Sequence, residues 1–523
     1  MKTFLDKLLE FYKIDEVTYQ SYLKHVTVED LPSRYNFAQI KEACAWLKEQ
    51  VKANKKILIY GDYDCDGVMS TSIIFNMLKQ DGFKPGFYIP FRETDGYGLN
   101  IKNIDRFHSL GYEVIVLVDN GITLTKEIDY LNSLGMKALI IDHHTPMEEL
   151  PKAEYIIHWQ TSGFGDINMS AGAISAYFSW EYLGYVDEYL FTLGMISLIS
   201  DLMELKGYNK TFVKIGLEFL NKNKYYNIVK LLNSEGEITE TDISMYVAPK
   251  VNAVGRIVND NGLFNVVRLF INDDKREIDR LVTYVNNVNE ERKTLVNEVH
   301  DTLDLKEFDD DPIVIKVLDI REGLASLVAN KVLEITNKPT LILVQDHNHE
   351  DKYKGSFRSR EGFNVVEVLH CCEDLLSAYG GHAFAGGMQV SFDNFEEFKQ
   401  RLVEYAKSHP FAKKSFNEYV DINLNEITLQ NYQILRTFYP FGNGNPLPLL
   451  RLKDFPCTSF RFTRDHKHVM TKVSFNSSLL IFNYEQEMLN NRSVNLYGRL
   501  EDSVFRGNHS AQFRVNHEDW NID

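Results

Sequence analysis

Carboxylates and imidazoles follow three apolar runs of this chain at a spacing that could bind metal ions. The run at 57–60 precedes Gly61-Asp62-Tyr63-Asp64-Cys65-Asp66-Gly67, the run at 114–118 precedes Asp119, and the run at 138–141 precedes Asp142-His143-His144. Buried parallel strands bring the residues that follow them to one edge of a sheet. Acids gathered there repel one another unless cations neutralise them. The sequence therefore predicts a metal site at the edge of an open α/β sheet.

The segment from Asp62 to Gly67 also matches the opening of an EF-hand calcium loop, with acids at positions one, three and five and glycine at six. That loop needs a bidentate Glu at position twelve, which is Ile73 here, and a helix before it instead of a β-like run. The calcium interpretation fails on both counts. Separate surface turns are the other alternative, which three successive strand-like runs disfavour.

Strand and helix patterns alternate from about residue 56 to 205, after a helical segment that covers residues 1 to about 50. A helix is predicted directly after Gly67, and another across 174–182. Such alternation predicts a mostly parallel sheet covered by helices.

The remainder of the chain divides into a long helix, a second α/β unit and a β-rich tail. Apolar residues on one face of 274–304 and charges on the other predict a solvated helix that connects two domains. Strand-like runs at 312–317 and 340–344 open a second α/β unit that reaches about residue 408. Segments 459–464, 468–470 and 493–500 predict short strands.

Composition sets the broad class. A chain of 523 residues is expected to form several domains, and 44% hydrophobic with 25% charged residues is ordinary for a soluble protein. We expect no membrane association and no secretion, since the sequence has neither an apolar run of about 18 residues nor a basic-then-apolar leader. Five cysteines without a CxxC pair favour a reduced, cytoplasmic compartment over a zinc–thiolate site. A net charge of −17 requires any nucleic-acid-binding cations to be confined to a groove.

Ten motifs give the chain a resemblance to a known family. They are GDYDCDG at 61–67, IPFRETDGYG at 89–98, VDNGI at 118–122, DHH at 142–144, SDLMEL at 200–205, PKVNAVGR at 249–256, REGLASLVANK at 321–331, GSFRS at 355–359, GGHAFAGG at 380–387 and PFGNGNPLP at 440–448. With these motifs the sequence resembles the DHH phosphoesterases and, among them, the RecJ-type single-strand-specific exonucleases.

The resemblance implies an α/β fold class in several parts. A mostly parallel-sheet DHH catalytic domain would be joined by a long helix to a second α/β, DHH-associated domain, with a C-terminal β-rich, OB-like domain. The expected parts are an N-terminal helical segment (1–50), the catalytic domain (51–210), a helical connector (211–304), a substrate-binding domain (305–410) and a nucleic-acid-binding domain (411–523).

Two divalent cations are the expected cofactors. Hard oxygen ligands with few imidazoles favour Mn²⁺, or Mg²⁺ as the alternative, over zinc or copper. The ligands implied by the resemblance are Asp62, Asp64, Asp66, Asp119, His143 and Asp201. Asp64 and His143 would share one metal, Asp66 and Asp201 the other, and Asp119 would bridge them. Asp142 would orient a neighbouring histidine, and His144 would donate to the scissile phosphate.

Two positions near these ligands need comment. Many relatives place a metal-binding histidine where this chain has Tyr60, so that ligand would come from Asp62 or from water. Asp62 could accordingly be a direct ligand or an acid behind the ligands. Cys65, between two proposed ligands, is interpreted as a small packing residue.

Substrate-binding residues are also implied by the resemblance, since phosphodiester recognition requires cationic and amide donors. They are Arg92, His144, Asn252, Arg256, Ser356, Arg358, Ser359, Gly380, Gly381 and His382. The alternatives are a surface salt bridge for any one arginine and a buried, hydrogen-bonded role for His382. The chain departs from the family at Arg321, where histidine is common, and at the second glycine of Gly386-Gly387.

The tail interleaves aromatic and cationic residues, and bases can stack on the former while phosphates contact the latter. Phe460, Arg461, Phe462 and Arg464 are the candidates.

The resemblance as a whole implies a metal-dependent exonuclease that degrades single-stranded DNA from 5′ to 3′ into mononucleotides. We expect it to act as a cytoplasmic monomer in DNA repair and recombination. A single-strand-binding protein or a helicase would be a further partner. The alternatives are a short-oligonucleotide or cyclic-dinucleotide phosphodiesterase and an inactive single-strand-binding scaffold.

Overall fold

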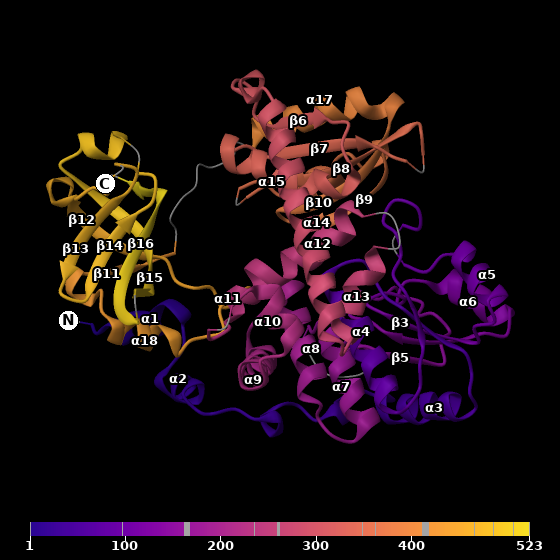
Figure 1. Cartoon of the computed structure of the whole chain (residues 1–523). Coiled ribbons are helices and arrows are strands. Elements are labelled where there is room, and N and C mark those ends of the chain that lie inside the picture. The colour runs from indigo at the N-terminus through magenta and orange to yellow at the C-terminus, as the bar shows by residue number, and fades with distance from the viewer. Residues whose placement is uncertain are drawn as a thin grey trace. The chain divides into compact units, whose positions relative to one another are not determined.

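The computed structural model describes residues 2–96, 98–161, 168–234, 236–258, 262–347, 349–360, 362–409, 418–464, 466–484, 486–505 and 507–521. Its contacts divide the chain into two units (Figure 1). The smaller unit combines Met1–Asp30, Glu204–Lys214 and Ser415–Asp523, and the larger combines Leu31–Met203 with Ile215–Lys414. No helix among the described residues is long and apolar enough to cross a membrane.

The larger unit begins with a parallel five-stranded sheet in the order β2-β1-β3-β4-β5. The strands are β1 (Ile57–Tyr60), β2 (Gly86–Tyr88), β3 (Val114–Val118), β4 (Lys137–Ile141) and β5 (Tyr155–Ile157). All residues of β1 and β3 are buried, as expected where helices cover both faces. The strand order reverses between β1 and β3, and open α/β sheets bind ligands at the carboxyl edge of such a switch point.

Helices pack on both faces of this sheet, which confirms the prediction from alternation. They are α3 (Ile40–Lys52), α4 (Cys65–Gln80), α5 (Ile101–Ser109), α6 (Thr125–Ser133), α7 (Ala171–Leu183) and α8 (Glu188–Ser200). Phe107 of α5 and Leu131 of α6 share a core with Ile115 of β3. Residues on all sides of α4 are buried, since α7 and α8 also contact it.

Further helices lead to the second α/β part of this unit. They are α9 (Gly207–Asn223), α10 (Tyr226–Leu232), α11 (Glu240–Asp242), α12 (Ala248–Ile257), α13 (Leu263–Ile271) and α14 (Lys275–Thr302). The long α14 is the predicted connecting helix and buries Ile278, Leu281 and Val285. It contacts α12, α13 and α15 (Glu322–Thr336), the last of which belongs to the second part (Figure 1).

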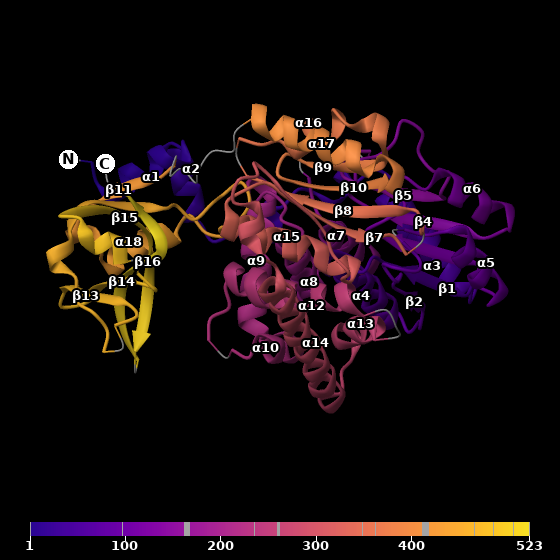
Figure 2. The same cartoon turned by 90° about the horizontal axis from the view of Figure 1, so that it is seen from above.

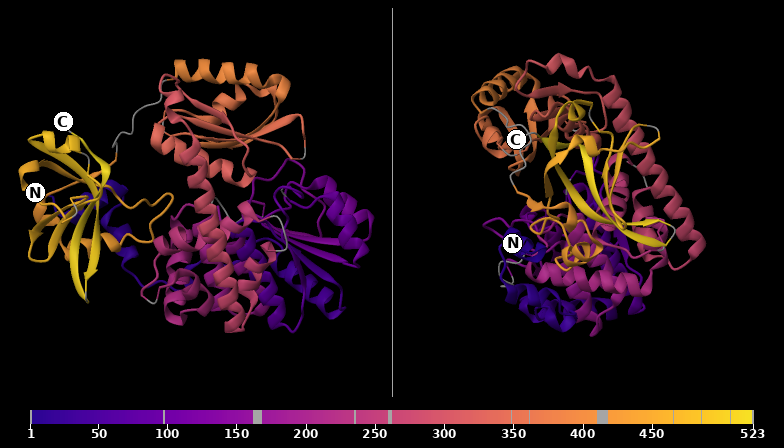
Figure 3. Two further views of the ribbon diagram at one scale, coloured as in Figure 1. Left: turned by 45° about the horizontal axis from the view of Figure 1, so that its top comes forward. Right: turned by 90° about the vertical axis from the view of Figure 1, so that its left-hand side faces the viewer.

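A mixed sheet forms the second α/β part, in the order β6-β7-β8-β10-β9. Its strands are β6 (Val314–Val317), β7 (Thr340–Gln345), β8 (Lys352–Arg358), β9 (Leu376–His382) and β10 (Ala385–Ser391). Helices α16 (Val365–His370) and α17 (Phe392–Ser408) lie along one face (Figures 2 and 3), where Phe398 packs on Phe357. Helix α15 covers the other face through Val328.

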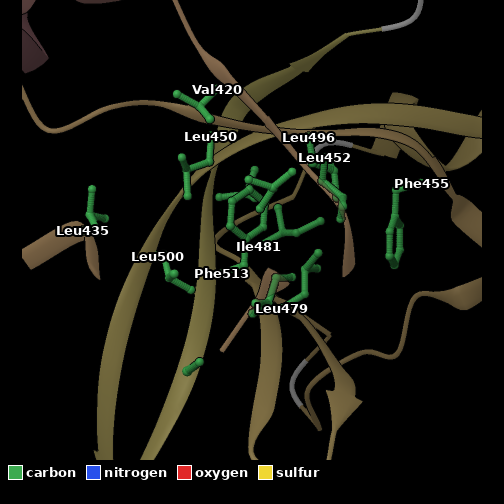
Figure 4. Packing of buried hydrophobic residues seen from close by; sticks show 14 of the residues in the cluster. Val420, Leu435, Leu450, Leu452, Phe455, Leu479, Ile481, Leu496, Leu500 and Phe513 are labelled. Carbon is green, nitrogen blue, oxygen red and sulfur yellow. The ribbon is translucent and has the colours of Figure 1, made fainter. Parts of the chain in front are cut away.

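The smaller unit is built on a six-stranded sheet in the order β11-β12-β15-β16-β14-β13. Its elements are α1 (Phe4–Tyr12), α2 (Glu16–Tyr22), β11 (Val420–Ile422), α18 (Leu429–Arg436), β12 (Leu450–Pro456), β13 (Val469–Ser474), β14 (Ser477–Ile481), β15 (Ser493–Phe505) and β16 (Asn508–Asn521). Leu452, Ile481 and Phe513 lie in its core (Figure 4). Phe4 of α1 joins the same core, and Lys7 pairs with Glu426 at 2.8 Å.

Two expectations about this unit need correction or comment. The predicted strand at 459–464 is absent from the described residues there, where a short 3₁₀ turn, Cys457–Ser459, is followed by one isolated bridge from Phe462 to Val469. The predictions at 468–470 and 493–500 are confirmed within β13 and β15. The expected domain boundary at 411 lies outside the described residues.

Candidate active site

The expected metal ligands meet at the carboxyl edge of the first sheet. Asp62 and Asp64 follow β1, Asp119 follows β3, His143 follows β4, and Asp201 caps the end of α8. Three groups have ligand atoms within 4.8 Å of one another: Asp62, Asp64 and Asp119; Asp66, His143 and Asp201; and Asp119, His143 and His144. Asp119 thus belongs to two groups, as a bridging ligand would. His143 is grouped with Asp66 and Asp201, whereas the expectation placed it with Asp64.

Local backbone geometry explains the sequence of the loop after β1. Asp64 is the N-cap of α4, and its Oδ1 accepts a 3.0 Å hydrogen bond from the Gly67 N–H. A Cβ at Gly67 would lie 2.5 Å from the Asp62 backbone, so only glycine fits. The amide oxygen of Asn252 on α12 accepts from the Cys65 N–H at 2.7 Å. Asn252, expected to contact substrate, therefore also fixes this loop to α12.

Helix α7 orients the Asp66 carboxylate. The Gly172 and Ala171 N–H groups, at the start of that helix, donate to its two oxygens at 2.8 and 2.9 Å. The Ser197 hydroxyl adds a 2.5 Å bond. A helix N-terminus stabilises an anion, so Asp66 is held as a fixed carboxylate next to the histidine. Its Oδ2 lies 3.7 Å from His143 Nε2.

Several acids of this edge lie close to one another and are largely buried, which raises their pKa values. Burial, with the neighbouring Asp64, raises the pKa of Asp62 to about 8. Burial, with Asp66, raises the pKa of Asp201 to about 8. The backbone of Asp119 has φ 61°, a left-handed conformation that is uncommon outside glycine and often found at functional sites.

One buried oxygen of this edge is suited to a cation. Asp62 Oδ1 has no hydrogen-bond partner among the described residues, and neither has Nδ1 of the His143 ring. Burial lowers the pKa of His143, and its Nε2 lies 3.3 Å from Asp119 and 3.5 Å from Asp201. Oxygen-rich ligands and a neutral imidazole fit divalent cations such as Mn²⁺ or Mg²⁺.

Asp142 and His144 form a pair beside this cluster. Asp142 Oδ1 lies 2.8 Å from His144 Nδ1, and Asp142 Oδ2 accepts from the Ile122 N–H at 2.9 Å. Burial alone would raise the pKa of Asp142, but the bond from the His144 ring lowers it to about 2. The same bond outweighs burial in His144 and raises its pKa to about 9. Asp142 therefore orients the His144 ring through Nδ1.

Sequence reasoning missed two residues that hold the DHH loop. His158 Nε2 lies 2.8 Å from the His144 carbonyl, and Trp159 Nε1 donates to the His143 carbonyl at 3.3 Å. Both follow β5, an apolar run that ends in a polar residue like the runs before Asp62, Asp119 and Asp142. That shared pattern could have found them.

Four arginines lie near one another beyond the acids. Burial lowers the pKa of the Arg256 guanidinium to about 10, and three neighbouring cations contribute. These cations are Arg92, Arg292 and Arg358. Arg92 lies 4.2 Å over the Tyr63 ring. Among the described residues, the hydrogen bonds of Arg256 and Arg358 go to carbonyls and a hydroxyl, not to carboxylates, so the salt-bridge alternative does not hold for them.

A pocket of about 440 Å³ opens beside these arginines. Ser356 and Gly380, both expected to contact substrate, line it together with Arg92. Lys354 also lines it and lies 3.1 Å from Glu322 and 3.6 Å from the buried Asp346. The pocket therefore offers cations and hydroxyl and amide donors at one place.

Three other residues that were expected to contact substrate, Ser359, His382 and Gly381, lie outside the lining of this pocket. Ser359 is buried and donates its hydroxyl to the Phe363 carbonyl, which commits it to the turn after β8. His382 ends β9 and is exposed, so the alternative of a buried histidine is wrong. Gly381 pairs with Gly386 in the β9–β10 hairpin. Arg321 donates to the Ile257 carbonyl of α12.

The aromatic residues of the tail divide by exposure. Phe460 is 4% exposed and stacks on buried Phe455, so the expectation that it contacts bases is not supported. Phe462 is 39% exposed, and Arg461 and Arg464 are exposed beside it. Sequence reasoning missed Phe475, which is 89% exposed with Lys472 Nζ 5.4 Å over its ring.

Comparisons with known proteins agree with this architecture. Family models for the DHH family N-terminal domain, the DHHA1 domain and the RecJ OB domain match residues 56–198, 310–408 and 420–517. The three matched segments follow one another along the chain in the order DHH, DHHA1 and RecJ OB.

Individual relatives and solved structures are similar to the chain over most of its length. The single-stranded-DNA-specific exonuclease RecJ of Bacillus subtilis is 29% identical over 473 residues, which cover 87% of this chain and 59% of the relative. The chain therefore spans about three fifths of that relative's length. A crystal structure of Thermus thermophilus RecJ with Mn²⁺ has the same fold, with a TM-score of 0.83 at 23% identity over 99% of this chain and 76% of that one. A manganese-bound exonuclease RecJ gives 0.61 at 26% identity over 73% and 97%.

Proposed function

We propose that this chain is a metal-dependent exonuclease that hydrolyses single-stranded DNA from 5′ to 3′ and releases 5′-mononucleotides in DNA repair and recombination. The observation that carries the proposal is the buried acid–histidine cluster beside Arg256 and Arg358, which form no hydrogen bond to a carboxylate in the described part of the chain. Such a surface is suited to a phosphodiester, since cations at the acids and guanidiniums next to them both face negative oxygens. The names of the RecJ relatives support the same substrate.

Asp62, Asp64, Asp66, Asp119, His143 and Asp201 would hold two divalent cations, Mn²⁺ first and Mg²⁺ as the alternative. Bound cations would supply an activated water and neutralise charge on the phosphoryl oxygens. The manganese-bound relative at 26% identity supports this choice of ion. The orphan Asp62 oxygen favours Asp62 as a direct ligand.

The chain's own residues would position the substrate. Asp142 fixes the His144 ring through Nδ1, so Nε2–H can donate to a phosphoryl oxygen. Arg92 lowers the pKa of Asp62 and Asp64 raises the pKa of Arg256, which supports a role for both guanidiniums in binding the reacting phosphate and its neighbour. The pocket with Ser356 and Gly380 would receive the terminal nucleotide.

Single-strand preference is assigned to the tail. Phe462 and Phe475 are exposed, and cations lie close to both. Unpaired bases can stack on such rings, whereas bases of a duplex are already stacked.

We propose that the chain has five parts. After the N-terminal segment (1–50) come the catalytic (51–210), connecting (211–304), substrate-binding (305–410) and OB-like (411–523) parts. A cytoplasmic monomer that works with a single-strand-binding protein or helicase completes the proposal.

A cleavage assay with Mn²⁺ tests this function. Single-stranded DNA, the same DNA as duplex, and RNA would each be labelled at either end, with Asp119→Ala as the inactive control. We expect mononucleotide release from the 5′ end of the single strand alone. Turnover of dinucleotides but not long strands would instead indicate a short-oligonucleotide phosphodiesterase. Binding without any turnover would indicate a scaffold, and either result would contradict the proposal.

A further inference from the structure

Two polar side chains on α14 are buried in a way that a solvated connecting helix does not require. Asn289 is 3% exposed, and its Oδ1 has no hydrogen-bond partner among the described residues. Arg292, three residues on, has a buried Nε that likewise lacks a partner in the described part of the chain. Residues three apart share one face of a helix. Leaving such groups unpaired is costly, and the Arg292 Nε–H is a donor that an anionic ligand can complete.

Among the described residues, no carboxylate forms an ion pair with Arg292. Helix α14 contacts α12 and α15, and Arg292 is one of the cations that lower the pKa of Arg256. The acid that acts on Arg292 is Glu290 on the same helix, but Glu290 is exposed and pairs with Lys293 at 2.8 Å. Two guanidiniums held near one another without a carboxylate favour an anion between or beside them.

We propose that Arg292 binds a phosphate of the single strand other than the one that reacts, through the buried Nε–H that has no partner among the described residues. The connecting helix α14 thereby becomes part of the strand-binding surface. This inference rests on the proposed function, because it names a further contact for the same substrate. Arg292 is a binding residue for a phosphate that does not react.

Equilibrium binding at several salt concentrations tests the role of Arg292. A fluorescent oligothymidylate would be titrated with the full 523-residue chain in EDTA. EDTA removes divalent cations, so it prevents cleavage and keeps the acidic edge free of metal in every variant. Arg292→Ala is expected to weaken binding about 10-fold. It should also lower the slope of log Kd against log salt by about 0.7, the value for one phosphate contact on a single strand. Arg292→Lys should keep the slope.

Arg280→Ala is the matched control, since Arg280 is exposed on the same helix and pairs with Glu277 at 2.7 Å. It should leave affinity and slope unchanged. In the Mn²⁺ cleavage assay, Arg292→Ala should raise KM about 10-fold and leave kcat within about twofold. Should Arg292→Ala fail to fold by circular dichroism, Arg292→Gln replaces it in both assays.

Three results separate failure of this inference from failure of the proposed function. An unchanged salt slope in Arg292→Ala, with normal binding by the unmodified chain, would overturn the role of Arg292 alone. A large fall in kcat at constant KM would overturn it too, because Arg292 would then act at the reacting phosphate. Absence of single-strand binding in the unmodified chain would instead refute the proposed function and, with it, the inference.

Discussion

The acidic edge of the first sheet and the aromatic surface of the tail differ in what fixes each side chain. At the edge, hydrogen bonds from α7 and from the Ile122 N–H hold Asp66 and Asp142 before any ligand arrives. On the tail, Phe475 projects from the turn between two strands and is 89% exposed. The first region suits chemistry that tolerates little displacement, and the second suits binding that tolerates any base. Rigid placement and adaptable stacking are thus divided between different parts of the chain.

The largest effect is expected at the edge. Asp64→Ala or His143→Ala should reduce cleavage by at least about two to three orders of magnitude, the loss that follows removal of one preorganised electrostatic partner. Binding of single-stranded DNA should change little, because other residues contact the strand. Turnover numbers and binding constants measured on the same preparations check this. Cleavage near the unmodified rate in either variant would remove these residues from the metal centre.

The tail gives a matched pair of phenylalanines. Phe460→Ala should lower the free energy of unfolding of the smaller unit by about 3–5 kcal/mol, since a buried ring leaves a cavity. Phe475→Ala should leave unfolding nearly unchanged and weaken single-strand binding by about 1–3 kcal/mol, the value of one stacked base. Urea unfolding and fluorescence anisotropy separate the two. Equal effects on stability would contradict the division between core and surface.

A moderate effect is expected for Arg358 in the substrate-binding part. Arg358→Ala should weaken the apparent affinity for DNA by about 1–3 kcal/mol through loss of a charged contact, seen as a raised KM. Arg276→Ala, which removes an exposed arginine of α14, serves as the control for net charge. An unchanged KM for Arg358→Ala would place this side chain outside the substrate path.

The smallest effect concerns the metal-free protein. Burial and neighbouring acids raise the pKa of Asp62 and Asp201 to about 8 in the folded state, against about 4 when unfolded. The folded state therefore binds more protons between these values, and stability falls as pH rises from about 4 to 8. In EDTA the Tm should drop by a few degrees between pH 6 and 8, and Mn²⁺ should restore it. Asp119→Asn should show a weaker pH dependence and little response to Mn²⁺.

The sequence alone predicts the acidic edge better than it predicts the surface of the tail. Apolar runs that end in acids located the edge, because a buried strand leaves few alternatives for the residues that follow it. The same pattern, an apolar run that ends in a polar residue, also predicts a role for His158. No sequence pattern distinguishes Arg292, because one cation on a charged helix resembles its exposed neighbours until packing buries it. Phe460 and Phe475 are alike in sequence, and only the fold decides which one enters the core.

Anomalous scattering from crystals of this chain grown with Mn²⁺ tests the central claim most directly. The account predicts two manganese peaks at the carboxyl edge of the first sheet, one near Asp62 and Asp64 and one near Asp66 and Asp201, with Asp119 between them. Absence of manganese at this edge, or occupancy confined to another part of the chain, would contradict it.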